Sequence, residues 1–113
     1  MSLRKKQSRF ARLVPRLIDK AFELGYEATL GDAYRDPRVH GPVGVKEGYG
    51  HPRSGHKLRL ALDLLLFRNG VYLTSTADHR DLGEWWERQD PDCRWGGRFG
   101  DGNHYSMEHD GVK

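Results

Sequence analysis

The sequence has few of the features that mark secreted or membrane-bound proteins. It contains a single cysteine, Cys93, so an intrachain disulfide is excluded. No apolar stretch approaches the roughly 20 residues that a membrane-spanning helix needs. The N-terminal segment MSLRKKQSRF is basic but lacks the apolar core of a secretory signal. We therefore expect a protein made in the cytoplasm without a signal peptide and without stable membrane insertion.

The composition indicates a folded domain with an uneven distribution of charge. The 113 residues are 36% hydrophobic and 31% charged, which predicts one domain with a modest core. The aromatic share of 11% argues against disorder. Residues 1–20 contain seven of the 19 Lys and Arg residues but only one of the 16 acidic residues. This basic segment either binds an anionic polymer, such as nucleic acid, a membrane surface or cell wall, or is a solvated helix face.

The first half of the chain reads as helix, then strand, then a long loop. Apolar residues recur at helical spacing over residues 5–25, with Pro15 best placed at the first position of a second helix and Gly25 as its end. Residues 26–35 are predicted to form a strand that runs into a turn. Residues 36–55 are rich in Gly and Pro, and long loops of this kind are often lids or binding loops.

The second half begins with the run LRLALDLLLF (58–67), which is apolar on both faces. It predicts a central strand that is covered on both sides. The following RNG (68–70) is a hairpin-turn signal, and VYLT reads as the returning strand.

The remainder predicts one more helix and a final strand. Thr76 or Asp78 can cap a helix that runs to about Gln89. A glycine-rich loop, PDCRWGGRFGDGN, follows, and HYSMEH (104–109) reads as the last strand. The elements together predict an α+β fold in which N-terminal helices pack on a central, mainly antiparallel sheet.

Asp63 is the one acidic residue inside the predicted central strand. An ionised carboxylate there costs several kcal/mol unless it is paired or bound to a metal. Arg59 shares its face but lies about 13 Å away along a strand, which leaves a cation from another segment or a metal ion. His56 and His104 can complete a site of two histidines and one aspartate with an open fourth position, which is typical of catalytic zinc. Asp101 would then be a proton carrier.

The four remaining histidines compete for these roles, because six histidines in a short chain allow many triplets. They are His40, His51, His79 and His109.

Two motifs give the triplet more support. Ser54-x-His56-x(6)-Asp63, with an alanine two residues before the aspartate, resembles the S-x-H-x-x-G-x-A-x-D signature of the M15 zinc peptidases. Asp101-x-x-His104 is similar to the second motif of that family, in which an acidic residue precedes the last zinc ligand and an aromatic residue follows it. The family contains D-alanyl-D-alanine carboxypeptidases and dipeptidases, and phage L-alanyl-D-glutamate endolysins.

The resemblance implies a cofactor, a set of ligands and two catalytic residues. Zn²⁺ would be held by His56, Asp63 and His104, and Asp101 would carry the proton of the attacking water. The segment GDAYRD (31–36) is similar to the family's G-Y-R segment, so Arg35 would face the scissile carbonyl.

The likeness runs from about residue 10 to residue 109 and is greatest to short, single-domain phage members. It implies that residues 1–113 form one zinc peptidase catalytic domain with a Hedgehog/DD-peptidase-like fold.

Two positions depart from the family pattern. Arg59 stands where the signature has Gly, which predicts a different backbone shape between His56 and Asp63 and an altered substrate subsite. Ala33 stands where a Gly is common. Three polar residues of the long loop are candidate substrate contacts: Tyr49, His51 and Ser54.

The expected function is that of a zinc-dependent peptidoglycan peptidase that cleaves the stem peptide of bacterial cell walls. A phage endolysin or wall-opening enzyme would reach the periplasm or cell wall after synthesis in the host cytoplasm, or act from the virion. We expect a monomer with no nucleic-acid partner. The motifs do not distinguish a carboxypeptidase from an endopeptidase, because both share the same zinc ligands.

Two other functions compete with this interpretation. A metal-dependent nuclease would suit the excess of positive charge, but phosphate chemistry recruits Lys or Arg around the metal, and here the cations gather in residues 1–20. A basic binding module without enzymatic activity would carry the same His and Asp residues in structural roles.

Overall fold

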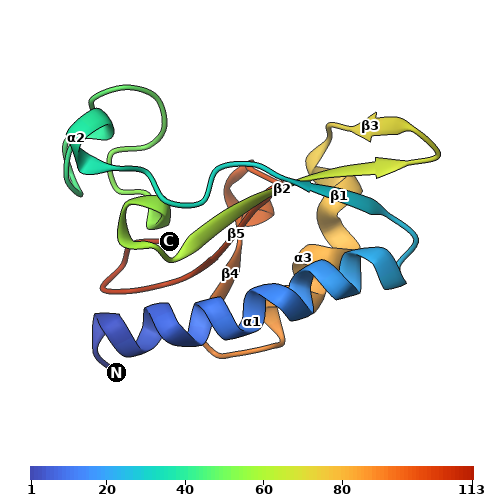
Figure 1. Ribbon diagram of the computed structural model, residues 1–113, viewed down its shortest axis with the longest axis horizontal. Helices are drawn as coiled ribbons and strands as arrows, with labels where there is room; N and C mark the ends of the chain where they lie inside the picture. Colours follow the sequence, from blue (N-terminus) through green and yellow to red (C-terminus); the bar gives the residue numbers. More distant parts are fainter.

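In the computed structural model, which describes residues 1–113, a long helix lies along one face of an antiparallel sheet (Figure 1). The helices are α1 (Leu3–Glu23), α2 (Pro37–His40) and α3 (Arg80–Glu87). The strands are β1 (Glu27–Leu30), β2 (Ala61–Arg68), β3 (Val71–Leu73), β4 (Cys93–Trp95) and β5 (His104–Met107). Three short 3₁₀ turns join them: η1 (Gly55–Leu58), η2 (Thr76–His79) and η3 (Gly96–Phe99). The expected α+β class is therefore confirmed.

Helix α1 is continuous, so the prediction of two N-terminal helices divided at Pro15 is wrong. The proline lies inside the helix and is exposed. A proline in a helix interior costs about 3 kcal/mol, because it removes one backbone hydrogen bond and crowds the preceding turn. The apolar stripe of Phe10, Leu13 and Leu17 continues past it into the core. Burial of that stripe outweighs the local penalty, since packing supplies most helix stability in proteins.

The sheet is organised around β2. Its strand order is β1-β2-β5-β4, and β3 also pairs with β2. The first half of β2 pairs with β5 and the second half with β3 on the same edge, while β1 pairs along the other edge. The predicted hairpin is confirmed: Asn69 and Gly70 both have positive φ, at 52° and 77°, which matches a two-residue hairpin turn.

Two predictions for the second half of the chain need correction. The expected glycine-rich loop contains β4, a strand of three residues that pairs with β5. Three residues are too few to show alternation, so periodicity could not detect this strand. The predicted helix is split into η2 and α3, and its cap is Ser75, whose side chain and that of Asp78 form a reciprocal capping box.

The two faces of β2 are covered to different extents. Leu62, Leu64 and Leu66 are at most 5% exposed and belong to a core that also contains apolar residues of α1 and α3. On the opposite face, Asp63 and Leu65 are only half-buried. The prediction of full cover on both sides is therefore wrong for one face, and that face carries the ionisable side chain. None of the helices combines the length and apolar composition needed to cross a membrane.

Candidate metal centre

Two of the three expected metal ligands are direct cross-strand neighbours. Asp63 of β2 pairs with His104 of β5 in the antiparallel register. Directly opposed residues project from the same face, with Cβ atoms about 5 Å apart. The main chain at Asp63 is also fixed from the other side, because Asp63 N donates to Asp32 O (2.8 Å) and Gly31 N donates to Asp63 O (2.8 Å). The sheet therefore places both side chains before any ligand binds.

The third residue, His56, is supplied by the turn that precedes β2. Ser54 caps this turn, since its hydroxyl accepts a hydrogen bond from the backbone N–H of His56 (3.2 Å). The turn ends at Arg59, which adopts a left-handed conformation with φ 58° and ψ 33°. Glycine adopts this conformation most readily. Arg59 thus holds a backbone conformation that suits a glycine, while the predicted difference from the family's backbone shape stays a prediction.

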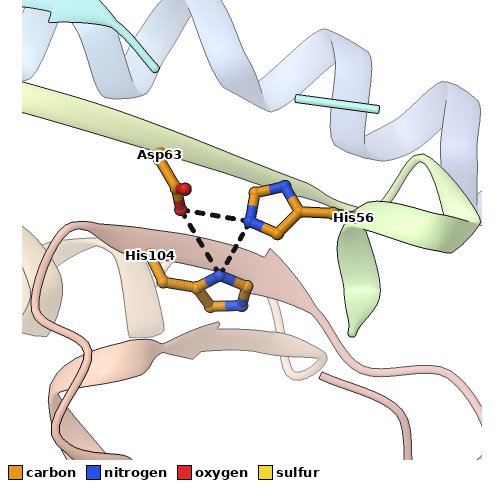
Figure 2. A group of neighbouring side chains, drawn as sticks. All are labelled: His56, Asp63 and His104. Carbon is orange, nitrogen blue, oxygen red and sulfur yellow. Dashed lines mark hydrogen bonds and ion pairs between the residues drawn. The ribbon is translucent and has the colours of Figure 1, made fainter. Parts of the chain in front are cut away.

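The three donor atoms converge with spacings that fit zinc. His56 Nε2 lies 3.1 Å from Asp63 Oδ1 and 3.2 Å from His104 Nδ1, and the remaining separation is 3.5 Å. Figure 2 shows the carboxylate and the two imidazoles pointing toward one centre. Tetrahedral zinc with bonds of about 2.0–2.1 Å requires donors about 3.3–3.4 Å apart. The residues present therefore fit a zinc ion with one coordination position free.

Hydrogen bonding makes one of these imidazoles a ready metal ligand. His56 Nδ1 lies 2.7 Å from the backbone carbonyl of Ala33, to which it donates its proton. A neutral imidazole then presents a lone pair at Nε2, toward the centre of the cluster. Metal-bound histidines characteristically hold this kind of outer partner, which fixes the tautomer and the ring orientation.

His104 is held differently. Its Nε2 atom is buried and has no hydrogen-bond partner within the protein. The ring is oriented instead by its strand position and by the edge of Phe99, with centroids 5.6 Å apart. The tautomer of His104 is thus less constrained than that of His56. Metal binding at Nδ1 would select the tautomer that carries its proton on Nε2.

The Asp63 carboxylate is ionised at neutral pH. Burial opposes the charged form, but contacts with His104 and His56 outweigh burial and lower the pKa of Asp63 to about 2. Arg59 is not its partner, because its guanidinium lies over the ring of Tyr34 at 3.9 Å. The partners of Asp63 are therefore the two histidines.

Asp101 lies beside the cluster and outside the set of three donors. Its Oδ2 is 3.9 Å from His104 Nδ1, and its side chain is 54% exposed. The tight loop that carries it depends on Gly96, whose carbonyl accepts from Asp101 N (2.8 Å). A Cβ at Gly96 would lie 2.1 Å from Asp101 O and 2.6 Å from His104 Cβ. A glycine at this position therefore lets the carboxylate approach the histidine.

Arg35 reaches the same region from the segment after β1. Its Nη1 donates to Ser54 Oγ (3.2 Å) and its Nε donates to Asp32 Oδ2 (3.3 Å). The side chain is only 11% exposed. Ser54 thus links Arg35 to the turn that carries His56, which gives this serine a structural role as well as a place beside the cleft.

A cavity of about 570 Å³ opens next to the three donors. His56, His104, Asp101, Arg35 and Ser54 all line it, and Phe99 is the single apolar residue among the twelve that do. Of the remaining predicted substrate contacts, His51 lines the cavity, whereas Tyr49 does not. Tyr49 is 60% exposed and lies against Arg35 and His40 instead.

Three of the four histidines that competed for the metal site lie elsewhere, and the fourth, His51, lines the cavity but is not among the three donors. His40 contacts Tyr49, and His79 bonds to the Tyr105 hydroxyl at 2.7 Å. His109 lies beside Asp110.

Sequence reasoning missed three cations of the cleft. Arg53, Arg98 and Lys113 line the cavity together with Arg35. The expectation that cations lie away from the site is therefore wrong. The error arose because these residues are scattered over 60 positions of the sequence, and only folding brings them together.

No protein-family model matches the chain, and no curated protein gives a significant match. The function therefore has to be inferred from the residues and their geometry.

Proposed function

We propose that the protein is a zinc-dependent peptidase with the ligand set of the M15 family and a Hedgehog/DD-peptidase-like fold. The observation that carries the proposal is the convergence of His56 Nε2, Asp63 Oδ1 and His104 Nδ1 at separations of 3.1–3.5 Å beside an open cavity. Two imidazoles and one carboxylate favour zinc over magnesium, which prefers oxygen ligands.

The neighbouring groups suit hydrolysis of an amide. A zinc ion held by these residues would supply Lewis acidity and would lower the pKa of a bound water molecule to about 7. Asp101, exposed and close to His104, accepts the proton of the attacking water and returns it to the leaving amine. Arg35 lines the same cavity and presents a permanent positive charge to the oxyanion that develops on the scissile carbonyl.

The polarity of the cleft suits a peptide that carries carboxylates. Four cationic side chains line the cavity, and Asp101 is the single acidic residue that does. The peptidoglycan stem peptide has free carboxylates and small side chains, so it needs charge complementarity more than an apolar pocket. We therefore propose that the protein acts on bacterial cell walls, as an endolysin or a wall-opening enzyme.

Digestion of purified peptidoglycan, with mass spectrometry of the products, tests this proposal. The zinc-loaded protein should release peptides or D-Ala, and both a chelator and Asp101→Ala should abolish release. Asp19→Ala is the matched control, because Asp19 is exposed on α1, where alanine fits the helical backbone, and does not line the cavity. Loss of D-Ala alone identifies a carboxypeptidase, and release of stem peptides or cross-links identifies an endopeptidase. The absence of any metal-dependent product contradicts the proposal.

A metal-dependent nuclease is the second candidate, and the four cations of the cleft favour it. The same preparation should be incubated with DNA and RNA in the presence of Zn²⁺ or Mg²⁺. Cleavage that Asp63→Asn abolishes would replace the peptidase proposal. We expect none, because the histidine-rich donor set is unsuited to the oxygen-seeking ions that most nucleases use.

The basic face of α1 offers a weak attraction to an anionic wall. Two of its cations are already engaged, since Lys6 Nζ donates to Glu108 O (2.8 Å) and Arg9 pairs with Asp90. The exposed, unpaired cations on the helix are Arg4, Lys5, Arg12 and Arg16. Changing these four residues to Gln should weaken wall binding at low salt and leave it unchanged at high salt, as screening predicts. Equal binding at low salt contradicts this role.

A further inference from the structure

Lys57 is a buried cation for which the proposed chemistry has no use. It follows the metal ligand His56 in η1 and is 8% exposed. Its ammonium donates three hydrogen bonds, to the carbonyls of His40 (2.8 Å), Pro42 (3.2 Å) and Val45 (2.5 Å). Lysine has three donors, so the group is fully satisfied by backbone oxygens alone.

The three acceptors all belong to residues 40–52, which we call the cleft loop. Two of the carbonyls also close turns within it, because His40 O accepts from Glu47 N (3.1 Å) and Pro42 O accepts from Val45 N (3.0 Å). In Figure 1 this segment leaves α2, extends outward and returns beside the turn that precedes β2. A buried ammonium is costly unless every donor is paired, so the loss of one carbonyl would make the buried position of Lys57 unfavourable. The three carbonyls therefore stay in place together or move away together.

The cleft loop in turn covers Arg35. The ring of Tyr49 packs edge-on against His40, with centroids 4.7 Å apart, and the Arg35 guanidinium lies 5.3 Å from the Tyr49 ring. Gly50 approaches so closely that a Cβ there would lie 2.4 Å from Arg35 Nη1. A continuous set of contacts therefore runs from the Lys57 ammonium through the loop to the guanidinium beside the cavity.

We propose that Lys57 is a positioning residue: its ammonium locks the cleft loop onto the turn that carries His56, and the loop thereby holds Arg35 at the wall of the cavity beside the metal centre. The role of Arg35 in this statement rests on the proposed function. The lock itself does not, so the two can be tested separately.

Hydrogen exchange measures the lock directly. In the wild-type protein the amides of Val45 and Glu47 should be protected, because both donate to carbonyls that Lys57 holds. Lys57→Met keeps most of the side-chain volume but removes the donors, and it should speed exchange in peptides from the cleft loop by at least about tenfold. Lys46→Met is the matched control, since Lys46 is exposed in the same loop. Unprotected amides in the wild type overturn the proposal without any variant.

Arginine modification measures the position of Arg35 without an activity assay. Phenylglyoxal should react slowly with Arg35, whose side chain is 11% exposed, and rapidly with Arg38, whose side chain is 89% exposed and serves as an internal reference. In Lys57→Met the ratio of the two rates should rise, with zinc affinity nearly unchanged. An unchanged ratio, or faster exchange throughout the whole chain, shows that Lys57 does not position Arg35 and overturns the proposal.

Chemical rescue separates the charge from the fold. Lys57→Cys alkylated with 2-bromoethylamine restores an ammonium at almost the same distance from the backbone. Cys93 should be spared, because burial raises the pKa of its thiol to about 12. Slow exchange and slow Arg35 modification should return after alkylation, and failure to return contradicts the proposal.

If the wild type hydrolyses peptidoglycan, Lys57→Met should lower kcat by about 10- to 100-fold, with a smaller change in KM. The loss is smaller than the roughly 100- to 1,000-fold cost of removing an oxyanion donor, because Arg35 is displaced and not deleted. An inactive wild type refutes the proposed function, while exchange and modification still decide the lock.

Discussion

On one face of β2, Leu62, Leu64 and Leu66 pack into the core; on the other, Asp63 faces His56 and His104. The contribution of the core face to stability depends on the apolar area that it buries. The site face depends on the separation of three donor atoms and contributes little apolar burial. One strand thus carries the core on one side and the candidate metal site on the other, and substitutions should separate the two.

The largest effect on stability should come from Leu64→Ala. Leu64 is 0% exposed, and deletion of a fully buried leucine side chain costs about 2–5 kcal/mol of unfolding free energy. Zinc stoichiometry of the folded protein should not change. Chemical denaturation checks the first expectation and metal analysis the second. A loss of zinc in the still folded variant would show that the two faces are not independent.

Asp63→Asn should weaken zinc binding strongly and affect stability less. Zinc affinity should fall by at least about 100-fold, or about 2.7 kcal/mol, because an amide is a poor replacement for a carboxylate ligand. The metal-free unfolding free energy should fall by no more than about 2.5 kcal/mol, given a pKa lowered to about 2 from an ordinary value of 3.8. Competition with a chromophoric chelator measures the first value. Unchanged affinity would remove Asp63 from the ligand set.

Gly96→Ala should affect both properties, because Gly96 adjoins both Asp101 and His104. The added methyl group meets backbone at 2.1 Å, so the loop must shift, at a cost of about 1–3 kcal/mol. Zinc affinity should fall as His104 moves. Gly55→Ala is the matched control, since its nearest neighbours would be 3.4 Å away. Equal behaviour of the two variants contradicts the account of the Asp101 loop.

Arg59 allows a finer test of the turn that supplies His56. Arg59→Gly should be more stable than Arg59→Ala by about 1 kcal/mol, because only glycine adopts a φ of 58° without strain. Thermal unfolding of the two variants measures the difference. The reverse order would show that the turn does not require the left-handed conformation.

The smallest effect should appear in the pH dependence of stability. Burial lowers the pKa of His79 below its ordinary value of 6.5, and Asp78 opposes the change. Below pH 6.5 the unfolded chain therefore takes up a proton before the folded one, and stability falls as the pH is lowered. With metal removed, His79→Gln should lose less stability between pH 7.5 and pH 5.5 than the wild type. Identical slopes contradict this assignment.

The sequence predicted the parts of the fold that have a strong local pattern. Alternation in LRLALDLLLF identified β2 and its two faces, and Asn69-Gly70 identified the hairpin. The three-residue strand β4 left no periodic signal, and Pro15 suggested a break that core packing prevents. Local rules fail in these places because tertiary contacts decide the outcome.

The candidate site was only partly visible for a related reason. Spacing and resemblance singled out His56, Asp63 and His104, which the structure brings together. The burial of Lys57 could not be foreseen, because a lysine enclosed by backbone carbonyls has the same sequence signature as a solvated one. Contacts to main-chain atoms do not depend on the identity of the partner residue, so a sequence motif cannot predict them.

The direct opposition of Asp63 and His104 has a consequence for the folding of the chain. A slip of one residue between β2 and β5 would bring a leucine opposite His104 and turn Asp63 toward the core. Under the proposed function, a metal ion can be held by both residues only in the correct alignment. Zinc would therefore act as a selector during folding, favouring the chains whose two central strands have paired in the one alignment that also creates the site.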